Sequence, residues 1–195
     1  MSRLYTFLWF LTVPFFTLFY PRKTSGRAHI PSGGALFCAN HSAASDPFFV
    51  AYGLGFRHQI HFMAKMELFN IPLLGALLRT LGTFPVDRRN GAAAIKSAMR
   101  LLKDGKKVLM FPEGTRSSTD DTTAKTGAIR IATQMGAAIV PVYIPRKKKP
   151  FRLNRVLIGE PYVVALNKKT ATAEDYAHHT AVMMNKIKEL GRHLT

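Results

Sequence analysis

Residues 35–47 read ALFCANHSAASDP, an apolar run followed by a polar run that ends in proline. The apolar part, Ala35 to Cys38, is typical of a buried strand. A second apolar run, Val108 to Met110, is followed in the same way by FPEGTRS at 111–117. In open α/β sheets, functional sites form outside the carboxyl ends of the strands. We therefore expect both polar runs to lie at strand ends and to contribute to one site.

The remaining segments alternate between strand-like and helix-like patterns. Strands are expected at 35–38, 59–63, 83–86, 108–110, 138–142 and 156–158, and helices at 47–54, 72–81, 92–103, 127–135 and 173–192. The helix from Ala92 is the best defined, because apolar residues recur every three or four positions before Gly105 ends it. This alternation predicts an α/β fold with a mostly parallel central sheet flanked by helices.

The composition limits the class of protein. A chain of 195 residues suits one α/β domain with a sizeable core. The 28 Lys and Arg residues against 11 Asp and Glu residues give a formal net charge of +17. This charge favours polyanionic partners such as acidic lipid headgroups, phosphorylated substrates or nucleic acid. The single cysteine, Cys38, excludes an intrachain disulfide, and no Cys/His spacing is typical of zinc, so no metal is expected.

The N-terminal segment favours a membrane surface among these partners. The 17 residues from Leu4 to Tyr20 carry no charge, and eight of them are aromatic. Such segments prefer the membrane interface. Because the segment is short for a span and contains Pro14, we expect a kinked, shallow anchor over 1–23, with a tilted single span or a core helix as alternatives. The basic residues Arg22 and Lys23 favour a cytoplasmic location for the domain that follows, 24–195.

His41 and Asp46 supply a base and a group that can orient it. Neutral imidazole near pH 7 can take a proton from a hydroxyl group while the hydroxyl oxygen attacks a carbonyl carbon. A carboxylate that accepts the other ring N–H fixes the tautomer and stabilises the imidazolium. The five-residue spacing permits this only if His41 lies outside any helix that contains Asp46. The alternative is that Asp46, followed by Pro47, simply caps a helix N-terminus.

Four blocks of the sequence together resemble the glycerolipid acyltransferases. The H-x-x-x-x-D pattern of His41 and Asp46 is followed, in the family's order, by GTFPVDR at 82–88, FPEGTRS at 111–117 and VPVYI at 140–144. One such block recurs by chance, whereas the ordered set is specific. The chain is similar to short bacterial 1-acylglycerol-3-phosphate (lysophosphatidic acid) acyltransferases over residues 40–144. The resemblance implies an acyltransferase domain at 24–195, with His41 as general base and Asp46 as its orienter.

The resemblance also implies a set of substrate-binding residues. Lys65, Arg88 and Arg116 are expected near the acceptor's phosphate, because a guanidinium group offers phosphate a rigid, permanently charged fork. The remaining members of the set are Glu113, Gly114 and Thr115. For Glu113, acceptor binding is preferred to an ion pair that positions Arg116.

Other features of the sequence receive less specific roles. Backbone N–H groups near Gly114 could stabilise negative charge on the thioester oxygen. The basic run at 146–149 is expected to carry solvated or lipid-facing charges, as are Arg89, Arg100, Lys106 and Lys107. The apolar run at 71–78 is expected in the core, with one face that could line an acyl chain.

The implied reaction is transfer of a fatty acyl group to the sn-2 hydroxyl of lysophosphatidic acid, which gives phosphatidic acid. Acyl-CoA or acyl-carrier protein is the expected donor substrate, and no resident cofactor is expected. Because the second substrate attacks directly, Ser42 and Ser45 need be no more than turn residues. The alternatives are acylation of glycerol 3-phosphate or another lysophospholipid, or a non-catalytic protein that binds anionic membranes. No signature of nucleic-acid binding is present.

Overall fold

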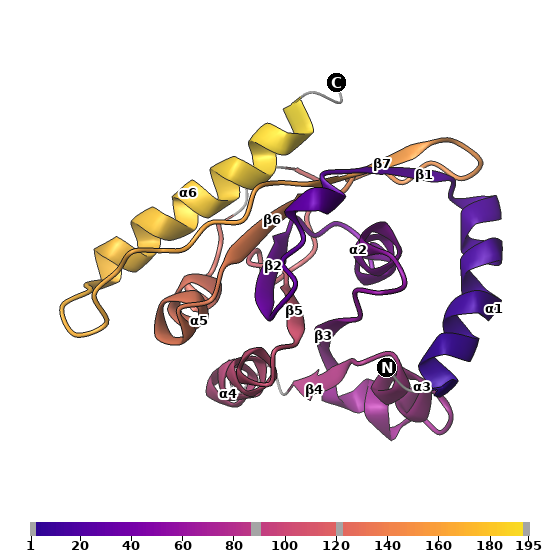
Figure 1. Ribbon diagram of the computed structural model, residues 1–195, viewed down its shortest axis with the longest axis horizontal. Helices are drawn as coiled ribbons and strands as arrows, with labels where there is room; N and C mark the ends of the chain where they lie inside the picture. Colours follow the sequence, from indigo (N-terminus) through magenta and orange to yellow (C-terminus); the bar gives the residue numbers. More distant parts are fainter. Residues whose placement is uncertain (1–2, 87–90, 120–122, 193–195) are drawn as a thin grey trace.

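The computed structural model of the chain describes residues 3–86, 91–119 and 123–192. Within these residues, seven strands form one sheet in the order β1-β7-β6-β2-β5-β3-β4 (Figure 1). The strands are β1 Arg22–Ser25, β2 Ala35–Ala39, β3 Ile60–Lys65, β4 Phe84–Val86, β5 Lys107–Met110, β6 Ile139–Tyr143 and β7 Asn154–Ile158. All neighbouring pairs are parallel except β6 and β7. The predicted mostly parallel sheet is confirmed.

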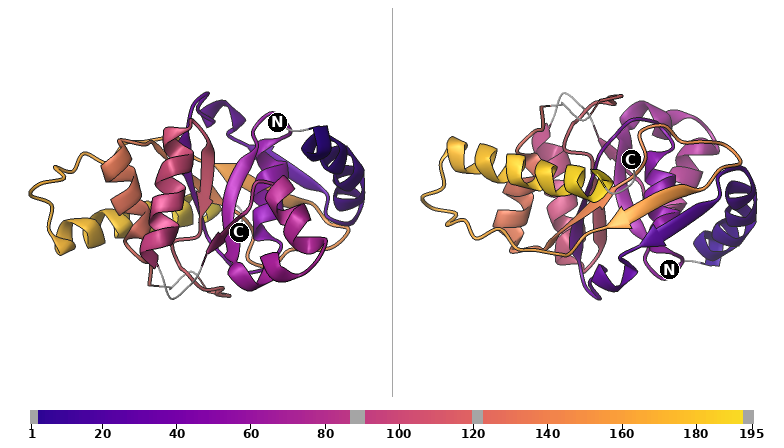
Figure 2. Two further views of the ribbon diagram at one scale, coloured as in Figure 1. Left: turned by 90° about the horizontal axis from the view of Figure 1, so that it is seen from below. Right: turned by 90° about the horizontal axis from the view of Figure 1, so that it is seen from above.

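Helices cover both faces of this sheet. They are α1 Arg3–Phe19, α2 Asp46–Leu54, α3 Leu74–Thr80, α4 Gly91–Lys103, α5 Gly127–Met135 and α6 Ala173–Arg192, with short 3₁₀ turns η1 Arg27–His29 and η2 Met66–Asn70. Figure 1 shows α4, α5 and α6 on one side and α2 and α1 on the other. Figure 2 shows α1 at one end of the molecule and the loop that enters α6 at the other.

The central strand β2 is buried along its whole length, as both of its faces are covered. Its residues alternate between two cores. Leu36 and Cys38 pack with α4, α5 and α6, whereas Phe37 packs with Phe49 and other residues of α2. Burial raises the pKa of the Cys38 thiol well above its usual range, so this side chain behaves as a small apolar residue.

The register of the sheet brings several loops to one edge. Cys38 in β2 lies beside Met110 in β5 and beside Pro141 in β6, and all three strands run in the same direction. The next strand along, β3, is also parallel to β5. The segments that follow β2, β5 and β6, and the end of β3 at Lys65, therefore share the carboxyl edge of the sheet.

Helix α1 packs one face against the rest of the chain and exposes the other. Tyr5 and Trp9 are buried with Tyr52 of α2, and the Trp9 and Tyr52 rings lie 4.9 Å apart. The opposite face exposes apolar side chains at 54–67%, namely Leu4, Phe7, Phe10, Leu11, Phe15 and Leu18. Pro14 lies within the helix. Among the described residues, no helix combines the length and the apolarity needed to cross a membrane.

Strand β1 was not expected from the sequence. Its four residues, RKTS, pair in parallel with Asn154 to Leu157 of β7 at the edge of the sheet. The boundary expected between residues 23 and 24 therefore falls inside a strand. Basic residues are common in edge strands, where they discourage pairing with other chains, and they mask the usual strand pattern.

Candidate active site

The loop between β2 and α2 brings His41 onto Asp46. His41 lies outside the helix, which begins at Asp46, and its Nδ1 lies 2.8 Å from Asp46 Oδ2. This confirms the expectation that His41 lies outside the helix that contains Asp46. The Asp46 side chain is fully buried, whereas 15% of the His41 side chain remains exposed. The His41 ring stacks on Phe111, with centroids 4.1 Å apart and planes 18° apart, so Phe111 restricts the orientation of the ring.

Asp46 is held from several sides. Its Oδ2 also accepts hydrogen bonds from the backbone N–H of Ser42 at 2.6 Å and of Ala43 at 2.9 Å, and its Oδ1 contacts Lys148 Nζ. Burial alone raises the pKa of this carboxyl group, but the hydrogen bonds from His41, Ala43, Lys148 and Ser42 outweigh it and lower the pKa. Asp46 is therefore an anion that only accepts hydrogen bonds, so His41 Nδ1 carries a proton, and in the neutral imidazole Nε2 is the nitrogen with the free lone pair.

The helix-capping alternative for Asp46 is wrong. The residue that precedes the helix is Ser45, and Asp46 is the first helical residue, with Pro47 directly after it. The Asp46 carboxylate faces back to the amides of Ser42 and Ala43 rather than forward to those of the helix. Pro47 suits this position because its missing N–H is not needed in the first turn.

Glu113 links the loop after β5 to His41. The residue is only 4% exposed, and its Oε1 accepts hydrogen bonds from the His41 backbone N–H at 3.1 Å and from Arg146 Nη2 at 2.8 Å. The ion pair considered for Glu113 therefore forms with Arg146 instead of Arg116. Arg146 also donates to the Ser117 carbonyl at 2.8 Å, so a single guanidinium group joins the loops after β5 and β6.

Two of the three expected phosphate ligands, Lys65 and Arg116, lie at the same edge of the sheet. Lys65 is exposed at the end of β3, and Arg116 is exposed on the loop after β5. Within the described parts of the chain, no ion pair occupies either side chain. Arg88 falls in the segment 87–90, outside the described residues. Gly114 and Thr115 are exposed, and Gly114 has a φ of 71°, a conformation that favours glycine.

The Gly114 N–H donates to the Phe111 carbonyl at 3.0 Å. This amide is therefore engaged in the turn itself, which leaves its neighbours among the backbone N–H groups expected near Gly114 as possible oxyanion donors. The turn instead presents the Thr115 and Arg116 side chains to solvent.

Comparisons with known proteins agree with this geometry. The acyltransferase family profile matches residues 22–145. The chain is 35% identical to the 1-acyl-sn-glycerol-3-phosphate acyltransferase of Bacillus subtilis over 86% of this chain and 87% of that protein. The chain belongs to the 1-acylglycerol-3-phosphate acyltransferase family. It is also 31% identical to the Salmonella typhimurium protein of the same name, over 82% of this chain and 69% of that protein.

A solved structure extends this likeness to the fold. The crystal structure of the 1-acyl-sn-glycerophosphate (LPA) acyltransferase from Thermotoga maritima matches with a TM-score of 0.68 at 26% identity. The match covers 92% of this chain and 76% of that one. The protein is therefore an acyltransferase with the fold of this family.

Two residues that bind the buried acids of this acyltransferase site, Arg146 and Lys148, were not expected there from the sequence. Arg146 and Lys148 were assigned to a surface run, which is wrong, because only 9% and 7% of their side chains are exposed. Lys147 and Lys149, in contrast, are exposed. The position of these residues in the chain could have indicated their role. Both lie in the loop that follows β6, and the neighbouring strand β2 leads into His41.

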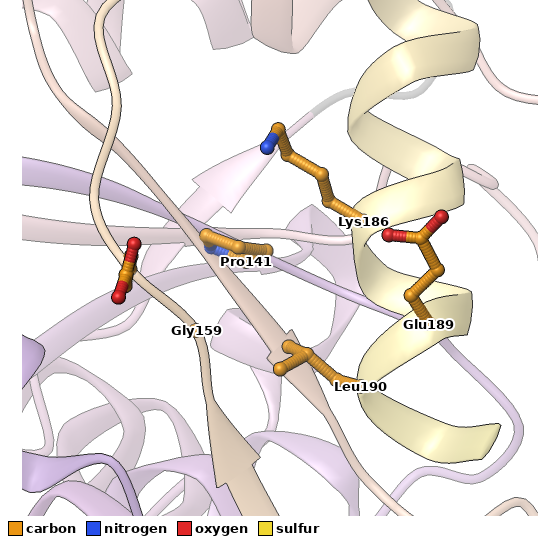
Figure 3. Close-up of a pocket in the computed structure, with 6 residues that line it drawn as sticks. Pro141, Gly159, Lys186, Glu189 and Leu190 are labelled. Carbon is orange, nitrogen blue, oxygen red and sulfur yellow. The ribbon is translucent and has the colours of Figure 1, made fainter. Parts of the chain in front are cut away.

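Two hollows in the described part of the acyltransferase lie away from these residues. A groove of about 260 Å³ lies between α6 and the sheet and is lined by Pro141, Gly159, Glu160, Lys186, Glu189 and Leu190 (Figure 3). A smaller apolar cavity of about 20 Å³ lies between α1 and α2 and includes Trp9, Phe48 and Tyr52. Among the described residues, no cluster of three or more His, Cys, Asp or Glu is placed to hold a metal.

The segment expected in the core at 71–78 is only partly there. Leu78 is buried, whereas Ile71, Leu73 and Leu77 are 38–87% exposed. Together with Met66 and Leu68 of η2, they extend the apolar surface of the acyltransferase beyond helix α1.

Proposed function

We propose that the protein transfers a fatty acyl group from an acyl thioester to the sn-2 hydroxyl of 1-acylglycerol 3-phosphate and so forms phosphatidic acid. The observation that carries this proposal is the His41–Asp46 pair, with its free Nε2 at the edge of the sheet that also carries Lys65 and Arg116. The Bacillus subtilis and Salmonella typhimurium relatives are named for acyl transfer to this acceptor, which supports the same acceptor here.

In the proposed mechanism, His41 Nε2 takes the proton of the acceptor hydroxyl while its oxygen attacks the thioester carbonyl carbon. The new C–O bond forms, the C–S bond breaks, and the imidazolium returns the proton to the leaving thiolate. The Asp46 carboxylate, 2.8 Å from Nδ1, stabilises the imidazolium between these two steps. No acyl-enzyme is needed. Consistent with this, the Ser42 hydroxyl donates to the Arg146 carbonyl and accepts from Lys148, as a structural link would.

We propose that Lys65, Arg88 and Arg116 bind the acceptor's phosphate, and that Gly114 and Thr115 line the site next to it. Lys65 and Arg116 support this part of the proposal, because both are exposed and neither forms an ion pair with another described residue. Glu113 contributes to acceptor binding through the loop, because its buried carboxylate is already bound by Arg146 and the His41 amide. It fixes the position of the turn that carries Thr115 and Arg116.

We propose acyl-CoA or acyl-carrier protein as the donor. The net charge of +17 supports both, since coenzyme A carries phosphates and acyl-carrier protein is acidic. The donor is a substrate in either case.

We further propose that α1 lies in the interface of an anionic membrane, on the cytoplasmic face of the cell membrane. The apolar outer face of α1 supports this, because an exposed apolar patch beside a basic domain suits a lipid surface. Phe151 is 68% exposed and lies 5.4 Å from the Phe19 ring, which extends the patch at the end of the helix. The strongly basic composition favours the leaflet with the negative surface potential, the cytoplasmic one.

A panel of acceptors tests the substrate assignment. The purified protein is given lysophosphatidic acid, glycerol 3-phosphate, a lysophospholipid with a headgroup and a monoacylglycerol, each with acyl-CoA and with acyl-carrier protein. We expect lysophosphatidic acid to give the highest kcat/KM, and monoacylglycerol to be at least about 10²-fold worse because two or more charge-assisted hydrogen bonds to phosphate are lost. Comparable rates on monoacylglycerol would contradict the assignment of Lys65 and Arg116. A preference for another phosphate-bearing acceptor would keep the mechanism and change the substrate.

Replacement of Phe7 and Leu11 by serine tests the membrane surface. Both side chains are about 60% exposed on the outer face of α1, at 62% and 60%. We expect binding to vesicles of equal parts phosphatidylcholine and phosphatidylglycerol to fall by roughly tenfold or more, because each apolar side chain contributes on the order of 1 kcal/mol when it leaves water. Cosedimentation measures this. Val163→Ser, at a residue 61% exposed near α6, is the matched control and should bind as the wild type does.

A further inference from the structure

We propose that Lys148 is a positioning residue for the general base, holding Asp46 so that its Oδ2 stays directed at His41 Nδ1. The inference rests on the proposed catalytic function of His41 and Asp46. It concerns a residue outside all four sequence blocks, in the loop between β6 and β7.

The contacts of Lys148 are specific. Its Nζ donates to Asp46 Oδ1 and, at 2.6 Å, to Ser42 Oγ. The ammonium group also lies 5.8 Å from the centre of the Phe49 ring, whose face attracts cations. The Lys148 side chain, from the loop after β6, therefore binds both Ser42 in the loop before α2 and Asp46, the first residue of α2. Only 7% of it is exposed.

A surface role does not account for this burial. Lysine is almost never buried unless it is paired, because the loss of hydration of an ammonium group costs several kcal/mol. Burial lowers the pKa of Lys148, the hydrogen bond and charge of Asp46 raise it in part, and Arg146 lowers it. The contact with Asp46 therefore offsets the loss of hydration of the Lys148 ammonium group. The neighbouring residues Lys147 and Lys149 are exposed and keep their hydration.

The division of contacts between the two Asp46 oxygens explains the positioning. Oδ2 receives His41 Nδ1 and two backbone N–H groups, whereas the Oδ1 contact is Lys148. A carboxylate bound at both oxygens cannot rotate, so Oδ2 remains in line with the imidazole. Without Lys148, only the hydrogen bonds to Oδ2 would resist rotation of the buried Asp46 carboxylate.

Lys148 also adjusts the charge that the imidazole experiences. Among the described residues, the charged groups that contact His41 or its partner Asp46 are Asp46 itself, Glu113 at the His41 backbone N–H, Arg146 at the His41 carbonyl, and Lys148 behind Asp46. The Lys148 cation partly cancels the negative charge of Asp46. In a variant without this cation, the full negative charge of Asp46 would favour the protonated imidazole. Acyl transfer by that variant would therefore require a higher pH.

Lys148→Met tests both effects, with Lys147→Met as the matched control of equal charge change in the same loop. We expect Lys148→Met to lower kcat/KM at neutral pH by about tenfold or more, because the variant removes from behind Asp46 a positive charge of the same sign as the imidazolium, and a like charge disfavours the charged form. The acid limb of the pH profile should move to higher pH, with much of the loss recovered in alkali and KM for the acceptor little changed. Lys148→Arg, which keeps the charge, should restore the position of the limb. Lys147→Met should match the wild type.

Three outcomes would overturn the inference. The first is a wild-type profile for Lys148→Met. The second is a uniform loss at every pH with a lower Tm, which would show a purely structural role. The third applies if Lys148→Met does not fold. In that case Ser42→Ala, which removes one of the two acceptors of the ammonium group, should give a smaller shift in the same direction, and an unshifted profile would contradict the inference.

Failure of the proposed function would look different. Absence of acyl transfer by the wild-type protein to every acceptor, or full activity after loss of the His41 imidazole, would refute the catalytic assignment itself. If Lys148→Met has the pH profile of the wild type while His41→Ala is inactive, only the positioning role of Lys148 is refuted.

Discussion

Replacement of His41 by alanine is expected to lower kcat for acyl transfer by about 10²–10⁴-fold, the usual contribution of a general base. In the proposed mechanism the imidazole Nε2 acts as the base, since Nδ1 donates to the buried Asp46 carboxylate at 2.8 Å. The remaining rate would come from the bound substrates alone. Initial rates with lysophosphatidic acid and acyl-CoA at saturating concentrations measure the effect.

Two controls separate catalysis from folding. His178→Ala removes an exposed histidine from α6, on the far side of the sheet, and should leave kcat unchanged. The His41→Ala variant should keep its vesicle binding and lose about 2–4 kcal/mol of stability, from the ring contact with Phe111 and the hydrogen bond to the Asp46 carboxylate. A kcat within a few-fold of the wild type would remove His41 as the base.

The layout of the site could be predicted from the sequence because parallel strands end at one edge. His41 and Glu113 are 72 positions apart, yet their strands β2 and β5 are neighbours in register, and the His41 amide donates to the Glu113 carboxylate. The apolar runs before each block were enough to place both blocks at strand ends.

The roles of Arg146 and Lys148 could not be predicted in the same way. A run of four basic residues is usually a solvated surface, and nothing in the run itself separates buried from exposed members. In the structure the exposure alternates, with Arg146 and Lys148 inward and Lys147 and Lys149 outward. That alternation depends on the partners Glu113 and Asp46, which lie 33 and 102 positions away in the sequence.

The two candidate roles of Asp46 illustrate a second limit. An aspartate before proline at the start of a helix satisfies the capping pattern and the orienter pattern equally well. The choice is made by the path of residues 42–45, which turns the Ser42 and Ala43 amides toward Asp46 and places His41 over it. Such a path follows from backbone geometry rather than from residue type.

Asp46→Asn is the second variant expected to have a large effect, with a fall in kcat/KM of about 10³–10⁴-fold, as is found when the orienting acid of a catalytic triad becomes an amide. The reason lies in the donors around the side chain. His41, Ser42 and Ala43 donate at Oδ2, and Lys148 donates at Oδ1. An asparagine NH₂ group must face donors in either orientation, so the imidazole loses its acceptor or Lys148 does.

The stability of Asp46→Asn should depend on pH in a defined direction. Near neutrality the variant leaves a buried ammonium group unpaired, which costs on the order of 3–5 kcal/mol. Because the folded protein lowers the pKa of Asp46, the contribution of the carboxylate is complete above the ordinary carboxyl pKa of about 4 and is lost as the pH falls through the lower, folded value. Urea denaturation should therefore show a large gap between wild type and Asp46→Asn at neutral pH that narrows in acid below about pH 4. Asp104→Asn, at an exposed residue after α4, is the control and should show no such gap. A gap that stays constant into acid would mean that Asp46 does not act as a buried, ionised partner of His41 and Lys148.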